Sequence, residues 1–512
     1  MQTVNAAFTA EEKDSVRYIS HNLNVSWKKF STLGNRTFTI GVSTIGGNDV
    51  IGINPGAIGS PANYKYFDES AYAQALAWER GLKMPVGGLA KSYAEAVLDN
   101  TSGRFTPRYM GGSSELFTAV LPRRPFTISA GFDVGGVDIT IPQFAGILDR
   151  QPEVDLRSKT VRLHGSDYID FFYNRFLDQE VMFTGQTVDQ IYTTLFNSLG
   201  VSTAQYELDY GINPIPFGLF EKGTRYAHIF HQLAEAENGH FYQDEEGIFR
   251  FENRQHWDGS PHNSVSKIIF TGQVIEAKAP DDDHLINVVE IKSKNWQKQV
   301  EQLIWKLSSP IGLPSGNTEL FIEFDSPVLA ANTPSFIVAN LAQDESGSDI
   351  STSISIKSFS LFAKTAKIVF YNSTVNGFLT QLSIYGRVAR PIEDIYIRSQ
   401  DDSSVTAFEE RVLQIENPYI QSLDWAKSFA QTILEDFSDI ENLQQVTIRA
   451  LPELQLGDLV SWQGRYWRIF DIKARISASD GFLQELTLLQ RTINTYFRIG
   501  ISTIGGSDKI AP

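Results

Sequence analysis

The stretch LPELQLGDLVSWQGRYWRIFDIKARISASDGFLQELTLLQR, residues 451 to 491, contains the clearest structural signal in the chain. Apolar and polar residues alternate along it, as they do in strands that bury one face. Gly457-Asp458 and Gln463-Gly464 interrupt the alternation and mark turns between successive strands. The stretch therefore predicts antiparallel strands that form a small barrel or sandwich.

The same alternation recurs through most of the chain. Gly, Asn, Asp and Pro separate the alternating segments, as expected for turns. We therefore expect a mainly β protein with a few helices (α+β), built from several β-barrel or β-sandwich domains. The segments predicted as strands are TVRLHGSDYIDFF (160–172), EGIFRFENR (246–254), KIIFTGQVIEAKA (267–279), INVVEIKSK (286–294), TELFIEF (318–324), TAKIVFY (365–371) and FLTQLSIYGRVAR (378–390).

Three segments have helical periodicity instead. Residues 187–200 begin with Thr187 as a predicted N-cap and end at Gly200. Residues 224–239 begin with Thr224 and end at a glycine, and residues 422–439 carry an apolar stripe with an acid near the start. AYAQALAWERGL, residues 71–82, fits either a helix or a strand.

Composition excludes several classes of protein. The 512 residues include 60 acids and 44 bases, a net charge of −16, which argues against a duplex-DNA binder held by phosphate contacts. The chain has no cysteine, so disulfides and thiolate catalysis are excluded. No segment reaches the ~18 apolar residues of a membrane span. The first residues lack the pattern of a secretory signal, so we expect no Sec-dependent export.

Clustered ionisable residues offer two candidate metal sites. His228, His231, Glu235 and His240 fall close together and could ligate a divalent metal, but no HExxH pattern is present. The alternative is an amphipathic helix with exposed histidines, which we favour. The aspartates 281–283 could bind Ca²⁺, but they lack the EF-hand spacing, and a solvated loop is the preferred interpretation.

Two other groups of residues have the composition of hydrolytic sites. Asp244, Glu245 and Glu246 could supply an acid/base pair for sugar hydrolysis. The preferred interpretation of FYQDEEGIFRF is a hairpin with its turn at Gly247. The Ser, His and Asp of LHGSDY (163–168) lie in one strand, where successive side chains point to opposite faces and cannot form a triad. Walker A and Gly-x-Ser-x-Gly motifs are absent from the sequence. We therefore predict no enzyme, no catalytic residues, no cofactor and no metal.

One segment occurs almost twice. FTIGVSTIGGNDVI (38–51) and FRIGISTIGGSDKI (497–510) share 10 of 14 residues. Each copy is predicted to form one strand that ends at Gly-Gly. A single strand is not stable alone and must pair with a sheet. We expect both to clip onto neighbouring subunits by β-augmentation; the alternative is a duplicated hairpin that folds back on its own domain. The predicted assembly residues are Phe38, Ile40, Val42, Ile45, Phe497, Ile499, Ile501 and Ile504.

Several stretches together resemble the baseplate or tail-tip hub family of bacteriophage tails and related injection machines, also named minor tail or tail-associated proteins. No single stretch is specific, and the resemblance rests on their order between residues ~70 and ~490. The stretches are AVLDNTSGRFTPRYM (96–110) with LPRRPFTISAGF (121–132), PQFAGILDRQPEVDLRSKTVRLHGSDYIDFF (142–172), HQLAEAENGHFYQDEEGIFRFENRQHW (231–257), and LPELQLGDLVSW (451–462) followed by YWRIFDI.

This resemblance implies a structural protein of the virion tail, assembled in the host cytoplasm. It implies a homotrimer in which two tube-forming β domains per copy make a pseudo-sixfold ring. That ring would join the sixfold tail tube, or a distal tail protein, to tip, spike or fibre proteins below. The tape measure protein and genome DNA would pass through its channel during ejection without specific binding, and an acidic channel wall would repel DNA.

The resemblance and the pattern together predict six parts with approximate, partly discontinuous boundaries. They are an N-terminal arm (1–60) with a strand at 38–47, a first tube-type β domain (61–165), an α/β insert domain (166–260), a second tube-type β domain (261–395), a helix with a small C-terminal β-barrel (396–495), and a C-terminal arm (496–512).

Two alternative functions stay open at this point. One is a tail-associated hydrolase of cell-wall glycan, which would use Glu245 and Glu246. The other is a receptor- or carbohydrate-binding tail-tip protein, in which exposed tryptophans stack on sugars. The candidate rings are Trp257, Trp296, Trp305 and Trp462.

Overall fold

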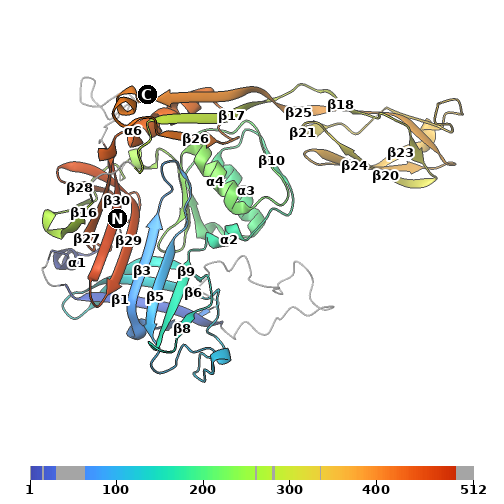
Figure 1. Cartoon of the computed structure of the whole chain (residues 1–512). Helices are drawn as coiled ribbons and strands as arrows, with labels where there is room; N and C mark the ends of the chain where they lie inside the picture. The colour runs from blue at the N-terminus through green and yellow to red at the C-terminus, as the bar shows by residue number, and fades with distance from the viewer. Residues whose placement is uncertain are drawn as a thin grey trace.

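The computed structural model describes residues 2–13, 17–29, 64–259, 262–278, 283–334 and 336–491. Strands dominate the described part, which confirms the mainly β prediction. A body of strands and helices carries a long arm that extends to one side and ends in a separate β domain (Figure 1). None of the helices in these ranges is long and apolar enough to cross a membrane.

The largest sheet has 14 strands and runs through the whole body. Its main hydrogen-bonded path is β16 (Val274–Ala277), β27 (Leu443–Arg449), β30 (Gly481–Arg491), β29 (Arg465–Ser477), β3 (Ala73–Gly81), β5 (Tyr93–Asp99), β9 (Thr160–Ser166), β7 (Asp138–Leu148), β6 (Pro125–Asp133), β1 (Ile19–Lys29) and β2 (Tyr64–Asp68). Beside this path lie β8 (Glu153–Asp155), β15 (Lys267–Ile268) and β28 (Leu459–Trp462). The ambiguous segment 71–82 is therefore a strand, β3.

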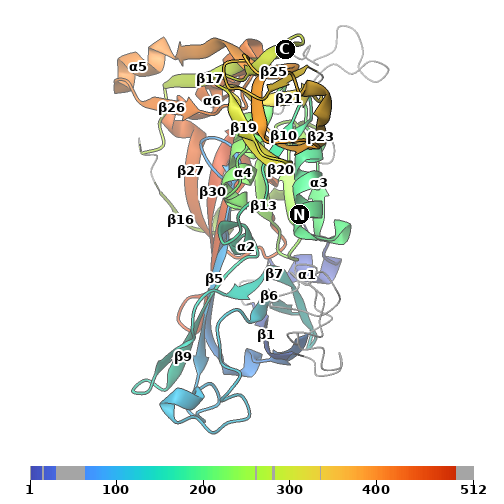
Figure 2. The ribbon, with the colours of Figure 1, turned by 90° about the vertical axis from the view of Figure 1, so that its right-hand side faces the viewer.

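The pairing of β3 with β29 joins the two ends of the described chain. The strands are antiparallel, from Asp471 opposite Gly81 to Ser477 opposite Ala75. Side chains from both halves share one core, in which the Trp78 and Phe482 rings lie 5.7 Å apart in an edge-to-face arrangement. Figure 1 shows β29, β3 and β5 side by side in the lower part of the body, and Figure 2 shows the same layer turned by 90°.

The C-terminal strands form the predicted turns but not a closed barrel. Gly457, Gln463 and Gly464 all have positive φ, and β28 and β29 form an antiparallel hairpin around the last two. The strands β15, β28, β29, β30, β27 and β16 pair in this order and form a curled sheet. Its two end strands, β15 and β16, are consecutive in the chain and are connected through the 3₁₀ turn η7 (Thr271–Gln273). Within the described residues no backbone pairing links β15 to β16. The barrel prediction is corrected to an open, curled sheet.

Helices of the middle region, residues 170–252, pack on a smaller sheet. This sheet has the order β11 (Tyr206–Leu208), β14 (Phe249–Glu252), β13 (His240–Gln243) and β4 (Gly88–Leu89), and a separate pair joins β10 (Val181–Phe183) to β12 (Gly218–Phe220). The helices are α2 (Asp170–Tyr173), α3 (Val188–Leu199) and α4 (Tyr226–Glu237). Aromatic rings fill the space between them; Phe230 and Phe241 have centroids 4.6 Å apart.

The helix predictions are confirmed, with one corrected boundary. Thr187 caps α3 in a capping box with Gln190, and Gly200 ends the helix in the left-handed conformation. Helix α4 instead begins after Arg225 and ends at Asn238, so Thr224 and Gly239 are not its caps. The Thr224 hydroxyl donates to the carbonyl of Glu221 and completes the preceding turn.

The arm begins as a ribbon of two long strands, with a third, short strand beside its root. β17 (Val288–Lys298) pairs antiparallel with one end of β25 (Gly377–Gln400), which has 24 residues, and parallel with β26 (Val412–Glu416). Next to the ribbon are α5 (Asp402–Phe408) and α6 (Leu423–Phe437), in which the Ser422 side chain caps the first turn. The N-terminal helix α1 (Ala6–Glu11) lies beside the C-terminal strands of the body.

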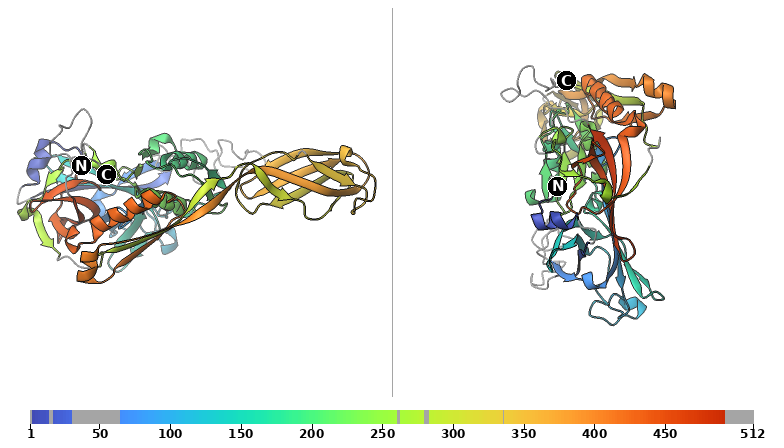
Figure 3. Two further views of the ribbon diagram at one scale, coloured as in Figure 1. Left: turned by 90° about the horizontal axis from the view of Figure 1, so that it is seen from above. Right: turned by 90° about the vertical axis from the view of Figure 1, so that its left-hand side faces the viewer.

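The tip domain at the end of the arm has its own apolar core. The other end of β25 pairs with β18 (Gln302–Lys306), β19 (Ile311–Leu313), β21 (Val328–Ala331) and β22 (Ile337–Asn340). Facing them is the sheet β20 (Gly316–Glu323), β24 (Thr365–Asn372) and β23 (Ile354–Leu361). Leu382, Ile368 and Phe370 are buried between the layers. Figure 3 shows this domain projecting well beyond the body.

Candidate functional site

A buried ion pair lies where three parts of the body meet. Nη1 of Arg80, on β3, donates to Oε2 of Glu245 at 2.6 Å, and both residues are at most 5% exposed. Glu245 sits in the turn between β13 and β14, and its other oxygen accepts from Gln455 of the C-terminal region. The pair therefore links the large sheet, the middle region and the C-terminal strands.

This arrangement decides between the two interpretations of Asp244, Glu245 and Glu246. β13 and β14 are an antiparallel hairpin, and Gly247 has φ +95°, so the turn prediction is confirmed. Asp244 accepts from the backbone of Ile248 at 2.9 Å and pairs with Arg250 at 2.7 Å. Burial raises the pKa of Asp244, while Arg250 opposes that shift. Asp244 and Glu245 thus fasten the hairpin within the fold.

The histidines near α4 do not converge. His228 is exposed, whereas Nδ1 of His231 accepts from the backbone of Leu89 at 3.2 Å. Glu235 accepts from Asn417 at 2.8 Å. His240 is buried on β13 and stacks on Trp257 at 5.1 Å, and burial lowers its pKa to about 3. No group of three potential metal ligands occurs in the part of the chain that the structure describes.

The His and Asp of residues 163–168 also serve the fold. His164 lies 3.5 Å from the carboxylates of Glu95 and Glu153 on the adjoining strands. Asp167 is buried and accepts from the backbone of Ser92 at 2.6 Å, and burial raises its pKa to about 7. These contacts join β9 to its neighbours.

A second buried cluster attaches the N-terminal segment. Glu12 and Glu453 are at most 1% exposed, and the ammonium group of Lys267 donates to both carboxylates. Burial and the neighbouring Glu453 raise the pKa of Glu12 to about 8. The backbone N–H of Gln2 adds a hydrogen bond to the Glu453 carbonyl at 2.8 Å. The cluster brings α1, β15 and the C-terminal strands together.

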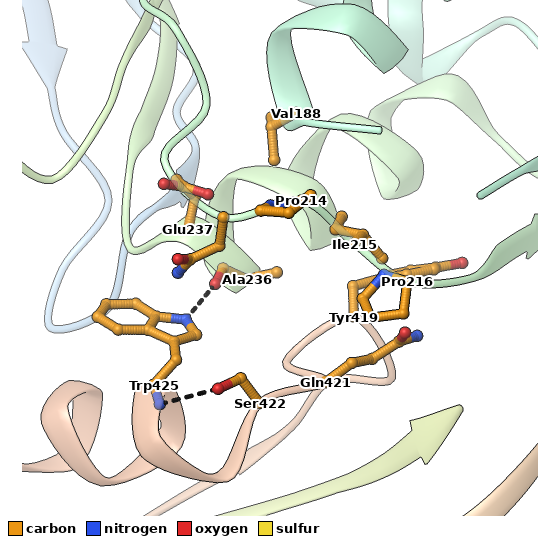
Figure 4. Close-up of a pocket in the computed structure, with 11 residues that line it drawn as sticks. Val188, Pro214, Ile215, Pro216, Ala236, Glu237, Tyr419, Gln421, Ser422 and Trp425 are labelled. Carbon is orange, nitrogen blue, oxygen red and sulfur yellow. Dashed lines mark hydrogen bonds between the residues drawn. The ribbon is translucent and has the colours of Figure 1, made fainter. Parts of the chain in front are cut away.

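A small cavity of about 60 Å³ lies where the starts of α3 and α6 approach the end of α4 (Figure 4). The indole N–H of Trp425 donates to the carbonyl of Ala236 at 2.8 Å. Glu237 also lines the cavity, and it pairs with Arg254 at 2.9 Å. This volume matches one or two waters at roughly 30 Å³ each, so the cavity is too small for an organic ligand.

The four tryptophans considered for sugar stacking have different surroundings. Trp462 is buried, and Trp305 packs against the apolar core of the tip domain. Trp257 stacks on His240. Trp296 lines a larger cavity, at the root of the arm. The first three of these rings therefore serve packing within the fold.

Several predicted residues lie outside the described residues. They are all eight assembly residues, Phe38, Ile40, Val42, Ile45, Phe497, Ile499, Ile501 and Ile504, together with Asp281 and Asp282. Arg80, Glu12 and Lys267 were not predicted, because each pairs with a residue more than 100 positions away and no local sequence pattern marks such pairs.

No family model and no curated protein matches the chain. Similar solved structures include the 43 kDa tail protein of prophage MuSo2 from Shewanella oneidensis, with 13% identity, covering 83% of this chain and 95% of that one at a TM-score of 0.44. A tail protein from Neisseria meningitidis MC58 has 10% identity, 83% and 94% coverage, and a TM-score of 0.46.

A third similar structure is the E. coli c3393 protein, described as a component of the type VI secretion system. It has 7% identity, 82% and 74% coverage, and a TM-score of 0.39. Two of these three similar structures are tail proteins, and the third is a component of a secretion system.

Loss of the Glu245 carboxylate tests the role of the buried ion pair. Glu245→Gln leaves the Arg80 guanidinium buried without a counter-charge, and we expect it to lower the free energy of unfolding by about 3–5 kcal/mol. Urea denaturation measures the change. The exposed neighbour Glu246→Gln is the matched control, with an expected change within about 0.5 kcal/mol. Equal effects of the two substitutions would contradict the structural role of Glu245.

The pKa of Glu12 predicts a pH dependence of stability. Because its pKa is raised in the folded chain, protonated Glu12 favours folding, and this contribution is lost as pH rises from the unfolded value near 4.5 through about 8. We expect thermal melts of the wild type to show a loss of stability on the order of 1–3 kcal/mol across that window. Glu12→Gln stays neutral and should weaken this dependence. Substitution of the adjacent residue, Glu11→Gln, is the control. The same pH profile in wild type and Glu12→Gln would contradict the assignment of the raised pKa to Glu12.

Proposed function

We propose that this chain is a structural hub subunit of a phage tail tip or of a related injection machine. In this role it joins the sixfold tail tube to the tip and lines the channel for genome passage. The observation that carries the proposal is the architecture itself: one sheet spans the body, and a β domain projects from it on a ribbon (Figure 1). Such a shape suits a part that spaces and connects neighbours.

Unpaired sheet edges support an assembly role. Within the described ranges the main path of the large sheet ends at β2 and β16. The three-stranded sheet of the tip domain ends at β20 and β23. Open edges invite pairing with another chain, so proteins cover them or use them. In an assembled ring, neighbouring subunits would cover these edges. The net charge of −16 would keep DNA from adhering to a channel wall.

The buried charges favour this role over hydrolysis of cell-wall glycan. Glu245 is engaged by Arg80 and Gln455, and Asp244 is engaged by Arg250. A general acid or a nucleophile must reach the substrate, whereas Glu245 is 5% exposed. A receptor- or carbohydrate-binding role is compatible with the hub role, because the two would use different surfaces.

The oligomer tests the proposal directly. We expect the purified chain to form homotrimers, with a measured mass about three times that of the monomer. Electron microscopy should show a ring with threefold symmetry and a central hole. A compact monomer at all protein concentrations, both alone and in the native particle, would contradict the hub role.

The repeated terminal strands generate a second test. We propose that residues 38–51 and 497–510 add to sheets of neighbouring proteins. Deleting residues 496–512 should leave a folded chain that no longer assembles, as measured by circular dichroism and light scattering. Lys509→Ala, which keeps the strand, should assemble normally. Insoluble protein after the deletion would instead favour a hairpin that folds back on its own domain.

A further inference from the structure

A cavity of about 340 Å³ lies at the root of the arm. One side belongs to the body and includes Phe217, Glu221 and Tyr419. The other side belongs to the base of the tip domain and to the ribbon, and includes Asp325, Lys364 and Trp296. The volume lies in the range of small-molecule sites, about 300–1,000 Å³.

Aromatic rings and prolines form the apolar wall. The Phe217 and Trp296 rings lie 4.7 Å apart, and Tyr419 packs on Phe220 at 5.0 Å. Gln421 fixes the backbone of Phe217, because its side chain accepts from the N–H at 3.1 Å and donates to the carbonyl at 2.6 Å. The wall is thus held in place before any ligand arrives. Pro327, Pro391 and Pro418 complete it.

Polar groups of both kinds occur at the rim. Lys364 pairs with Glu221 at 2.9 Å across the gap between the tip domain and the body, with both side chains largely exposed. Asp325 is exposed and supplies acceptor oxygens. The ammonium of Lys364 is a donor, whereas the carboxylates of Asp325 and Glu221 are acceptors.

The aromatic wall and the rim with charges of both signs together favour one class of ligand. A cation would be favoured by the rings and carboxylates but opposed by Lys364, and an anion would be opposed by Asp325 and Glu221. A purely apolar ligand would desolvate the charged rim. A hexose has C–H faces that stack on aromatic rings, and its hydroxyl groups both donate and accept hydrogen bonds.

We propose that the cavity lined by Trp296, Phe217, Tyr419 and Asp325 binds a single hexose unit, either free or at the end of a glycan. The sugar ring stacks on the aromatic wall, and its hydroxyl groups bond to the rim. This site does not depend on the hub role, since a monomeric chain would contain it as well. An assembled tip would carry one copy per subunit.

Binding by the full-length chain tests the proposal. The probes are glucose, galactose, N-acetylglucosamine and N-acetylgalactosamine, each titrated to about 50 mM because single sugars are expected to bind with Kd near 1 mM or weaker. Saturation-transfer NMR and calorimetry report binding. At least one sugar should bind saturably, with the strongest saturation transfer to its ring C–H protons.

Three variants locate the site. Trp296→Ala should weaken binding about tenfold through loss of ring stacking. Asp325→Asn removes the charge of an exposed acceptor without disturbing the core, and should also weaken binding. Tyr396→Ala, which removes another exposed ring of the same ribbon outside the cavity, should leave binding unchanged. Failure of all four sugars to bind saturably, or binding unchanged in both Trp296→Ala and Asp325→Asn, would overturn the proposal.

Discussion

Strands β3 and β29 are separated by almost 400 residues, yet they share a continuous backbone ladder from Gly81–Asp471 to Ala75–Ser477. This pairing makes one sheet out of strands from both ends of the described chain, and one apolar core lies against it. The middle region and the arm are both inserted between the paired strands in the sequence, so their relative positions depend on this ladder. Pairing at such a sequence separation carries a loop-closure cost, which grows slowly with loop length, and the apolar surface buried against the sheet offsets it.

Buried charges reinforce the same frame. Arg80, Glu245 and Gln455 connect the sheet, the hairpin of the middle region and the C-terminal strands, and Glu12, Lys267 and Glu453 fasten the N-terminal helix. An ion pair taken out of water adds little net stability, but removing one partner costs much more, so such pairs favour one arrangement of the parts over others. The chemistry of these residues therefore supports a defined geometry, in agreement with an assembly role.

Local features of the fold were predictable from sequence, and long-range ones were not. The cap and end of α3 and the hairpin at Gly247 follow from a few neighbouring residues. Strand β25 was predicted only over 378–390 but continues through Pro391, which lies at a bulge where the paired β17 shifts register. The β3–β29 ladder and the cavity at Trp296 were missed, because alternation shows that a strand exists but not which strand lies beside it.

Hydrogen exchange of the native chain tests the claim that this ladder holds the molecule together. If it does, the paired backbone amides of β3 and β29 exchange only through the largest opening of the body, and they do so together although they are far apart in sequence. Protection of the tip domain, which has its own core, should be lost separately. Early loss of protection in β29 while β3 stays protected would contradict the account.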